Sequence, residues 1–326
     1  MLSRFAPSPT GRMHLGNIFS AMLSWLSAKA QGGEWLLRIE DIDPQRSRQE
    51  YADLIMSDLE WLGLTWDKGP YYQSQRYDIY EEYLRRLTER GLVYPCYCTR
   101  ADILATQAPH ESDGRVVYKG TCRPKNSATV PENSFSVPPS HRSRKFIFGL
   151  TPSQFSTFNS QFASPAALRL IVPDSVVTFT DGHYGEQAVN LAEHCGDFIV
   201  RRKDGAWAYQ LAVVIDDALM GITEVVRGCD LLLSSPQQIY LAELLGFQPP
   251  HFCHLPLLCN SSGQRLSKRD KSLDMSVLRN NSTPEQILGT LAYHAGITPT
   301  PTPMTAKDLI PHFSWNKVPI NNITIH

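Results

Sequence analysis

The sequence lacks the features that mark membrane and secreted proteins. Among its 326 residues, no uncharged apolar run approaches the about 20 residues needed to cross a bilayer. No cleavable apolar leader precedes Arg4. The seven cysteines are odd in number and spread over a long chain, which argues against a secreted disulfide framework. These absences predict a cytoplasmic protein that is not inserted in a membrane.

The chain also lacks an excess of charge of either sign. Lys and Arg together number 31 against 32 for Asp and Glu, so the formal net charge is -1 at pH 7 and no overall positive field indicates nucleic acid. A polyanionic partner must therefore bind to a local patch of basic side chains. HRSRK at 141–145 and RRK at 201–203 are candidates for phosphate contact, although each segment alone is more typical of a solvated surface.

What the sequence does contain is an alternation of strand and helix patterns. Residues 2–6 predict a short strand, residues 18–30 an amphipathic helix, and EWLLRIED at 34–41 a buried strand. Ser47 and Glu50 have the spacing of a capping box ahead of a second helix, and a third amphipathic helix follows. Alternation of this kind favours an α/β fold with a parallel sheet that helices cover on both faces.

Differences in composition divide the rest of the chain into an irregular segment and segments with regular secondary-structure patterns. Residues 124–164 are rich in Ser, Pro, Asn and Phe without sustained periodicity, which indicates an inserted segment. Regular patterns resume at ALRLIVP, 167–173, where we expect the sheet to restart. The expected parts are the first half of a nucleotide-binding domain at 1–90, an insertion at 91–165, the second half of that domain at 166–248, and a helical C-terminal part at 249–326.

The segment RFAPSPTGRMHLGN, residues 4–17, connects the first predicted strand to the first helix. Ligands of parallel sheets bind where loops leave the carboxyl ends of the strands. Gly11 and Gly16 allow the backbone to approach a flat or anionic ligand, and His14 lies where the helix N-terminus favours phosphate. The G-x-G-x-x-G and G-x-x-x-x-G-K-[ST] patterns are both absent. On spacing alone, the alternative is an ordinary Pro/Gly turn with a solvent-facing histidine.

This segment resembles the HIGH signature of class I aminoacyl-tRNA synthetases in its glutamyl and glutaminyl branch, with HLGN at 14–17 standing for the motif. RIEDID at 38–43 and AYQLAVVIDDALMGITEVVRG at 208–228 resemble further blocks of that branch, and RLSKR at 265–269 resembles its KMSKS loop. The resemblance covers about residues 1–280. It implies a Rossmann-like parallel sheet with an inserted zinc-containing acceptor-type domain and a small helical C-terminal part.

The resemblance also implies a site for glutamate and for ATP with Mg²⁺. The glutamate-binding residues would be Arg4, Ala6, Ser8, Glu40, Tyr209 and Arg227. The ATP-binding residues would be His14, Gly16, Asn17 and Lys268, of which His14 and Lys268 are also the expected catalytic residues. The chemistry of the side chains agrees, because an arginine fork suits a carboxylate and a glutamate at a strand end suits an α-ammonium group. For any one of these charges taken alone, a surface ion pair is the ordinary alternative.

A second cluster consists of Cys96, Cys98 and Cys122, whose thiolates can take three corners of a tetrahedral zinc site. Two ordinary cysteines are the alternative interpretation of a C-x-C pair. Resemblance to the short members of the branch implies one zinc ion per chain, held by these three cysteines and Tyr118. Tyrosine is an unusual ligand, and His110 is the rival fourth donor. The remaining cysteines have apolar neighbours and are expected to be core thiols.

Two departures separate the chain from the full-length glutamyl enzymes. Fewer than 60 residues follow Lys268, which leaves no room for an anticodon-binding domain, and Val213 stands where those enzymes carry Asn four residues after Tyr209. Both favour the short members, which activate L-glutamate with ATP without tRNA and attach it to the cyclopentene-diol of queuosine at the wobble position of tRNA(Asp). The alternatives are a truncated enzyme that charges a tRNA 3′ end and a catalytically inactive synthetase-like RNA-binding protein. The family implies a monomer.

Overall fold

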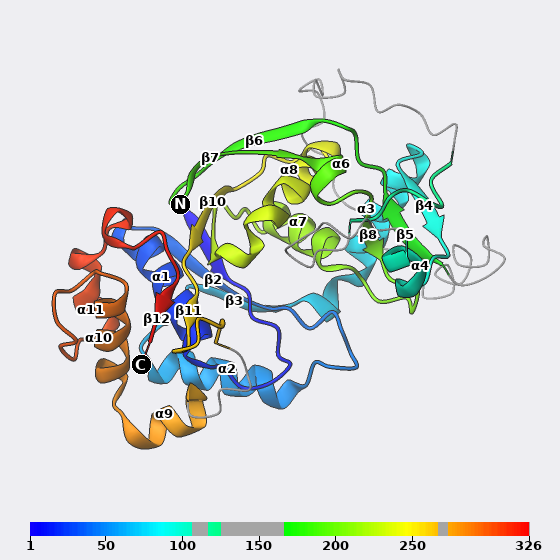
Figure 1. Cartoon of the computed structure of the whole chain (residues 1–326). Helices are drawn as coiled ribbons and strands as arrows, with labels where there is room; N and C mark the ends of the chain where they lie inside the picture. Colours follow the sequence, from blue (N-terminus) through cyan, green and yellow to red (C-terminus); the bar gives the residue numbers. More distant parts are fainter. Residues whose placement is uncertain (106–116, 125–165, 267–272, 326) are drawn as a thin grey trace.

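The computed structural model describes residues 1–105, 117–124, 166–266 and 273–325. Its centre is a five-stranded sheet in the order β10-β9-β1-β2-β3, in which every neighbouring pair is parallel (Figure 1). Its strands are β1 (Leu2–Phe5), β2 (Glu34–Ile39), β3 (Lys68–Tyr72), β9 (Glu224–Gly228) and β10 (His251–Leu255). The predicted parallel sheet is confirmed, and β1 pairs with strands from distant parts of the chain.

Both faces of this sheet are covered, as the alternation predicted. Side chains of β2 alternate between two apolar clusters, with Trp35 and Leu37 on the side of α1 and Leu36 beside Val225 on the other. The helices that follow the strands are α1 (Leu15–Ala30), α2 (Gln49–Trp61), α3 (Tyr77–Glu89), α7 (Tyr209–Leu219) and α8 (Ser235–Leu244). α1 is buried along most of its length, because the C-terminal helices pack against it from outside.

The start of α2 differs from the prediction. The capping box of Ser47 and Glu50 is wrong, because Arg48 is the N-cap residue and no side chain caps this helix. The Ser47 backbone N–H turns back to the carbonyl oxygen of Asp43 at 2.9 Å, so the helix begins one residue later than the spacing required. The Ser47 hydroxyl is buried and has no hydrogen-bond partner among the described residues.

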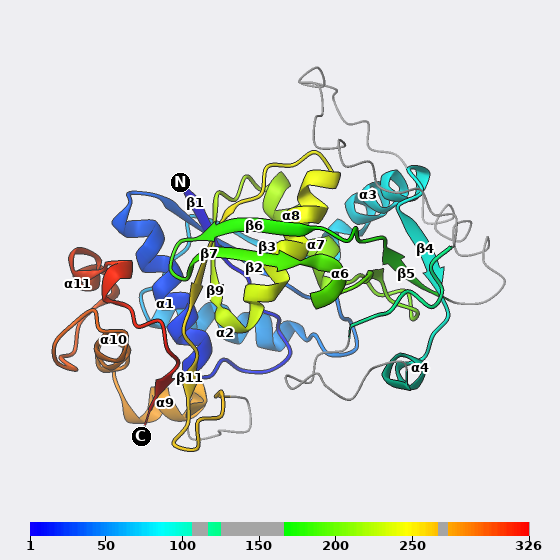
Figure 2. The ribbon, with the colours of Figure 1, turned by 45° about the horizontal axis from the view of Figure 1, so that its top comes forward.

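The expectation that the sheet restarts at residue 167 is also wrong. β5 (Ala167–Leu170) pairs antiparallel with β4 (Val93–Cys96) and β8 (Phe198–Arg201), which makes a separate three-stranded sheet. The reason is that β4 already offers a free edge, and Cys96 pairs with Ala167 across it. The hairpin of β6 (Val176–Asp181) and β7 (Gly185–Asn190) follows and runs alongside α8 (Figure 2). Short helices α4 (Arg100–Ala105) and α6 (Leu191–His194) lie in the same half.

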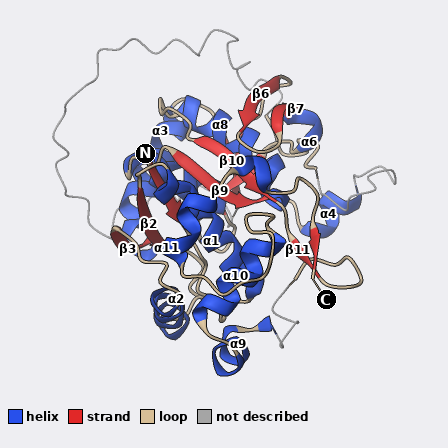
Figure 3. Ribbon diagram, turned by 90° about the vertical axis from the view of Figure 1, so that its left-hand side faces the viewer, coloured by secondary structure: helices blue, strands red, loops and turns tan. Residues whose placement is uncertain are grey.

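The C-terminal part returns to the first half of the chain. α10 (Pro284–His294) and α11 (Ala306–Leu309) lie beside α1 (Figure 3), whereas α9 (Met275–Asn281) contacts α2 through Arg279. β11 (Leu258–Cys259) pairs with β12 (Ile323–Thr324), and the 3-10 segments are η1 (Gln73–Arg76), η3 (Cys229–Ser234), η5 (Ile310–His312) and η6 (Trp315–Lys317). None of the helices in the described ranges combines the length and apolar character that a membrane span requires.

Candidate functional site

A cavity of about 490 Å³ lies at the carboxyl ends of β1, β9 and β10. Nine of the residues predicted from the sequence line it together: Arg4, Ala6, Ser8, His14, Gly16, Asn17, Glu40, Tyr209 and Arg227. Lys268 lies outside the described residues, although Arg265 and Leu266, which precede it, line the same cavity. The predicted residues of positions 4–40 and those of positions 209–227 therefore meet at the edge of the sheet where ligands of such folds bind.

One wall of the cavity is a buried chain of alternating charges. Arg4 Nε lies 3.3 Å from Asp217 Oδ1, Arg38 Nη1 lies 2.7 Å from the same oxygen, and Arg38 Nη2 lies 3.1 Å from Glu40 Oε1. Each of the four side chains belongs to a residue that is at most 6% exposed. Because each charge has an opposite neighbour, Arg4 and Glu40 are held in place without closing the cavity that they line.

The pKa values of the two carboxyl groups in this wall are shifted in opposite directions. Burial alone would raise the pKa of Asp217, but the two guanidinium groups of Arg38 and Arg4 overcome it and lower that pKa. For Glu40, burial is the larger influence and raises the pKa, although Arg38 and Arg4 oppose it. A further cation beside the Glu40 carboxylate would therefore favour its charged form. An α-ammonium group has the required charge.

The opposite wall is built around Arg227 of β9. Its Nη2 donates to Ser235 Oγ at 2.8 Å, its Nη1 donates to Gln238 Oε1 at 2.8 Å, and its Nε donates to His254 Nε2 at 3.1 Å. His254 Nε2 accepts, so the ring proton is on Nδ1, which donates to Asp181 Oδ2 at 2.6 Å. Burial lowers the pKa of His254, which keeps the ring neutral beside the guanidinium. The Arg227 fork is thus fixed by buried groups from three elements.

Sequence reasoning missed the residues that hold the two arginines. Arg38 and Asp217 lie in segments that resemble synthetase blocks. A usable signal was the presence of charges within apolar runs, a single arginine in the strand and an Asp-Asp pair in the helix. Asp181 and His254 carried no such signal, because they are 73 residues apart and meet only where the β6–β7 hairpin packs on β10.

His14 performs a local structural task as well as lining the cavity. It is the N-cap of α1, where its Nδ1 accepts from the Gly16 backbone N–H at 3.1 Å while its own N–H donates to Asn17 Oδ1 at 3.1 Å. In the neutral ring the proton then resides on Nε2, which can donate to an anion. A Cβ on Gly16 would lie 3.0 Å from the His14 ring, so a larger residue there would press on the ring.

A buried carboxylate links this loop to the helix that follows RLSKR. Asp58 of α2 is fully buried, and its Oδ1 accepts from Arg12 Nη2 at 3.2 Å and from Arg279 Nη1 at 2.9 Å. Beside it, the Met275 backbone N–H donates to the carbonyl oxygen of Met13 at 3.0 Å. The first residues of α9 are therefore tied directly to the loop that ends in His14.

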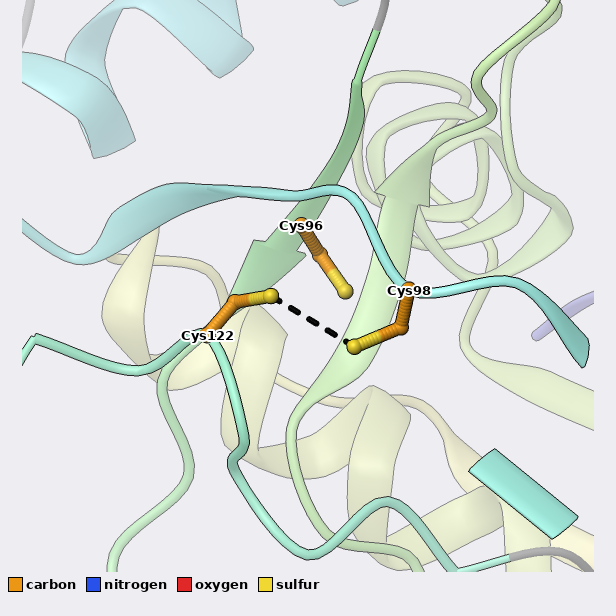
Figure 4. Close-up of side chains that lie close together, drawn as sticks. All are labelled: Cys96, Cys98 and Cys122. Carbon is orange, nitrogen blue, oxygen red and sulfur yellow. Dashed lines mark hydrogen bonds between the residues drawn. The ribbon is translucent and has the colours of Figure 1, made fainter. Parts of the chain in front are cut away.

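Away from the cavity, Cys96, Cys98 and Cys122 form a cluster at the end of β4 (Figure 4). Their sulfur atoms all lie within 4.8 Å of one another, so the cluster could bind a metal such as zinc. The Tyr118 hydroxyl lies 3.5 Å from Cys96 Sγ and 3.8 Å from Cys98 Sγ. His110 lies outside the described residues, and the fourth ligand stays a prediction.

The surroundings of the cluster favour the thiolate form of Cys122, whereas burial and the contact with Cys122 raise the pKa of Cys98 to about 11. Burial opposes ionisation of Cys122, but a backbone hydrogen bond at Tyr97 and contacts with Tyr118 and the other two thiols lower its pKa to about 7. The Arg169 guanidinium lies over the Tyr118 ring at 3.8 Å and donates to the carbonyl oxygen of Asp197 at 2.6 Å. The Tyr118 ring is therefore held at the cluster by a buried cation.

The basic segment at 201–203 is largely engaged within the protein. Arg201 pairs with Glu81 at 2.5 Å and lies over the Trp207 ring, while Arg202 pairs with Asp43 at 3.0 Å. The arginines at 201 and 202 are therefore less available for phosphate contact than the sequence indicates. The other basic segment, 141–145, lies outside the described residues.

The chain is similar to known proteins over almost its whole length. The family described as tRNA synthetases class I (E and Q), catalytic domain, matches residues 1–319. Among curated proteins, the glutamyl-Q tRNA(Asp) synthetase of Nitratidesulfovibrio vulgaris is 46% identical over 97% of this chain and 93% of its own length. That of Symbiobacterium thermophilum is 42% identical over 100% and 96%.

Solved structures agree with these relatives. The glutamate tRNA ligase of Elizabethkingia meningosepticum, in complex with its amino acid, has a TM-score of 0.75 and 28% identity and matches 100% of this chain and 67% of its own. The cavity, the two buried arginine walls and the extent of these matches lead to one assignment. The chain belongs to the glutamyl and glutaminyl family of class I tRNA synthetases, in its group of glutamyl-Q tRNA(Asp) synthetases.

Proposed function

We propose that this chain activates L-glutamate with ATP in the 490 Å³ cavity and transfers the glutamyl group to the cyclopentene-diol of queuosine at the wobble position of tRNA(Asp). The observation that carries the proposal is the placement of Arg4, Arg227 and Glu40 around one cavity beside the His14-capped helix. Two cations and one anion complement an amino acid that has two carboxylates and one ammonium group. The names of two similar curated proteins, both glutamyl-Q tRNA(Asp) synthetases, support the tRNA part.

Each wall has a distinct part in glutamate binding. Arg4 binds one carboxylate of the substrate, because its Nη1 donors lie beyond the two contacts with Asp217. Arg227 binds the other, because two of its five N–H groups make only long contacts, at 3.5 Å to the Tyr209 hydroxyl and to the Leu231 carbonyl oxygen, which a carboxylate can replace. Glu40 binds the α-ammonium group, which supplies the cation that its buried carboxylate lacks. The Tyr209 hydroxyl lies 3.5 Å from Arg227 Nη1, and the Tyr209 ring closes the pocket.

In the first step a carboxylate oxygen of glutamate attacks the α-phosphorus of ATP. The bond from that phosphorus to the bridging oxygen breaks, and pyrophosphate leaves with the electron pair. His14 and the N-terminus of α1 at Gly16 and Asn17 stabilise the phosphate charge, with Lys268 as the expected second cation. Mg²⁺ bound to ATP would neutralise further charge on the same oxygens. Positioning and charge stabilisation are sufficient, since no protein nucleophile is needed.

In the second step a hydroxyl group of the queuosine diol attacks the carbonyl carbon of glutamyl-AMP. An ester bond forms, the bond from that carbon to the AMP oxygen breaks, and the hydroxyl proton passes to solvent. The mixed anhydride is already activated, so this step requires the diol to reach the same cavity in the correct orientation.

The decisive experiment for this function measures glutamate-dependent ATP–pyrophosphate exchange without RNA, followed by transfer to tRNA. We expect exchange with glutamate and much less with glutamine or aspartate, then glutamylation of tRNA(Asp) that contains queuosine. Queuosine-free tRNA(Asp) should not be glutamylated. Equal charging of unmodified tRNA(Glu) would instead support an enzyme that acts on a 3′ end. The absence of any exchange from folded, zinc-loaded protein would support an inactive RNA-binding protein.

We also propose that Cys96, Cys98, Cys122 and Tyr118 hold one structural zinc ion, which would join the end of β4 to residues 117–124. Replacing Cys122 with alanine is expected to abolish zinc binding and to lower the melting temperature by about 5 °C or more, because a ligand of the cross-link is lost. Exchange should persist, since the cluster lies outside the cavity. Metal analysis and thermal denaturation check both effects.

The matched control for this variant is Cys195→Ala, which removes a thiol outside the cluster. It should keep one zinc ion per chain. Equal zinc content in both variants would exclude Cys122 as a ligand, and Tyr118→Phe separates the tyrosine from a donor elsewhere in the chain.

A further inference from the structure

We propose that a second cavity, beside the first, is the subsite for the modified guanine-type base that carries the diol. This inference rests on the proposed function and adds to it the position of the nucleobase. The cavity has a volume of about 220 Å³. Pockets for drug-sized ligands have volumes of about 300–1,000 Å³, so this cavity suits a smaller group such as a nucleobase. Its lining comes from Pro9, from residues 39–52 around the start of α2, and from residues 72–77 after β3.

The two cavities share one edge of the sheet. The first lies at the carboxyl ends of β1, β9 and β10 and reaches Glu40 directly after β2, and the second lies at the ends of β2 and β3. The loop after β1 separates them, because Ser8 lines the first cavity and Pro9 the second. Neighbouring strands are about 4.8 Å apart, so the centres of the two cavities are separated by about two to three strand spacings. A base in the second cavity can extend a flexible, diol-bearing substituent across this loop into the first.

The apolar part of the second cavity suits the face of a base. Ile39 and Ala52 are buried, and the rings of Tyr72 and Tyr77 stand at its sides. Proteins that read RNA sequence take unstacked bases from single-stranded loops and stack them on aromatic side chains. The wobble base of an anticodon loop is such a base.

The polar part matches the hydrogen-bonding edge of guanine. The Asp41 carboxylate is oriented by Ser74, whose backbone N–H and hydroxyl donate to it at 2.8 and 2.6 Å. Each carboxylate oxygen retains a second acceptor position for the N1–H and exocyclic amino donors of a guanine-type base. Ser47 lines the cavity, and its hydroxyl is buried and has no hydrogen-bond partner in the described part of the chain. Burial without a partner is costly, which points to a ligand that supplies one.

A basic side chain lies at the same cavity. Arg48 is exposed at the start of α2 and lines the opening. An arginine that lines the cavity can bind the phosphate of a bound nucleotide in bidentate fashion. One cavity thus combines stacking rings, an oriented carboxylate, an unsatisfied hydroxyl and a cation.

The test uses Tyr72→Ala and Asp41→Asn in the full chain, with Tyr71→Ala as the matched control. Tyr71 is the adjacent residue of β3, is 42% exposed and does not line the cavity. We expect the KM for queuosine-containing tRNA(Asp) to rise about tenfold or more in the two cavity variants, because stacking and edge recognition are lost. Tyr71→Ala should leave it within about twofold of the wild type, and glutamate-dependent exchange should stay within the same range in all three.

A second measurement keeps the inference testable if a variant fails to fold. Free queuosine nucleoside is titrated into the wild type and into Ser47→Val, which narrows the cavity without removing a ring. Binding by the wild type and at least about tenfold weaker binding by Ser47→Val support the subsite. Equal binding by both, or an unchanged KM for tRNA in Tyr72→Ala and Asp41→Asn, overturns it. Absence of exchange in the wild type contradicts the proposed function, and nucleoside binding then decides the subsite alone.

Discussion

Replacing Arg227 with lysine is expected to lower kcat/KM for glutamate by about 100-fold or more in ATP–pyrophosphate exchange. The Arg227 guanidinium contacts Ser235, Gln238 and His254 through three different nitrogen atoms while it faces the cavity. Lysine has one nitrogen on a flexible stem and cannot reproduce a planar fork. Loss of one partner from a buried, hydrogen-bonded charge pair costs about 2–5 kcal/mol, equal to about 30- to 5,000-fold.

The control for this substitution is Arg202→Lys, at a half-exposed pair with Asp43 and Asp204 outside the first cavity. It should change kcat/KM by less than about threefold. If Arg227→Lys retained the wild-type KM for glutamate, the guanidinium would not be a substrate ligand. The assignment of this wall to glutamate would then be wrong.

Replacing Asp58 with asparagine is expected to raise the KM for ATP about tenfold and to lower the free energy of unfolding by about 3–5 kcal/mol. The fully buried Asp58 carboxylate is the common partner of Arg12 and Arg279. An asparagine leaves two guanidinium groups without their anion, one in the loop that leads to His14 and one in α9. Chemical denaturation and the ATP dependence of exchange measure the two effects.

The KM for glutamate distinguishes positioning from general damage in this variant. It should change by less than about threefold, because Asp58 contacts neither arginine wall of the glutamate pocket. Equal increases in both KM values would indicate a general distortion of the cavity rather than displacement of the ATP-binding loop. A loss of folded protein would lower the apparent kcat and leave both KM values unchanged. Glu34→Gln, which removes an exposed pair with Lys68, serves as the control and should alter neither KM value.

Much of the fold could be predicted because helix and strand periodicity are local properties. β1, β2 and the three first helices follow from apolar spacing, and the segment 4–17 could be placed at a strand end from its Pro and Gly content. The pairing of β5 with β4 could not be predicted from the sequence. An apolar strand such as β5 can pair with the edge of either sheet, and only the tertiary structure decides which edge is available. The Ser47 capping box failed for a related reason, because a turn at Asp43 decides where α2 begins.

The candidate site shows the same division. The side chains that face the cavity could be predicted from their chemistry and from the resemblance of their segments to known blocks. The side chains that hold them could be predicted only in part. Asp217 supports Arg4 from a helix 213 residues away, and Asp181 supports Arg227 through His254 from a hairpin. Such contacts depend on tertiary packing, which no local pattern encodes.

The central position of β1 has a consequence for synthesis on the ribosome. β1 pairs on one side with β2, which follows within 40 residues, but on the other side with β9, where Ser3 faces Glu224. A nascent chain must therefore wait for more than 200 further residues before its first strand is enclosed. During that interval Leu2–Phe5 remains an open strand edge, the kind of surface that chaperones shield from aggregation.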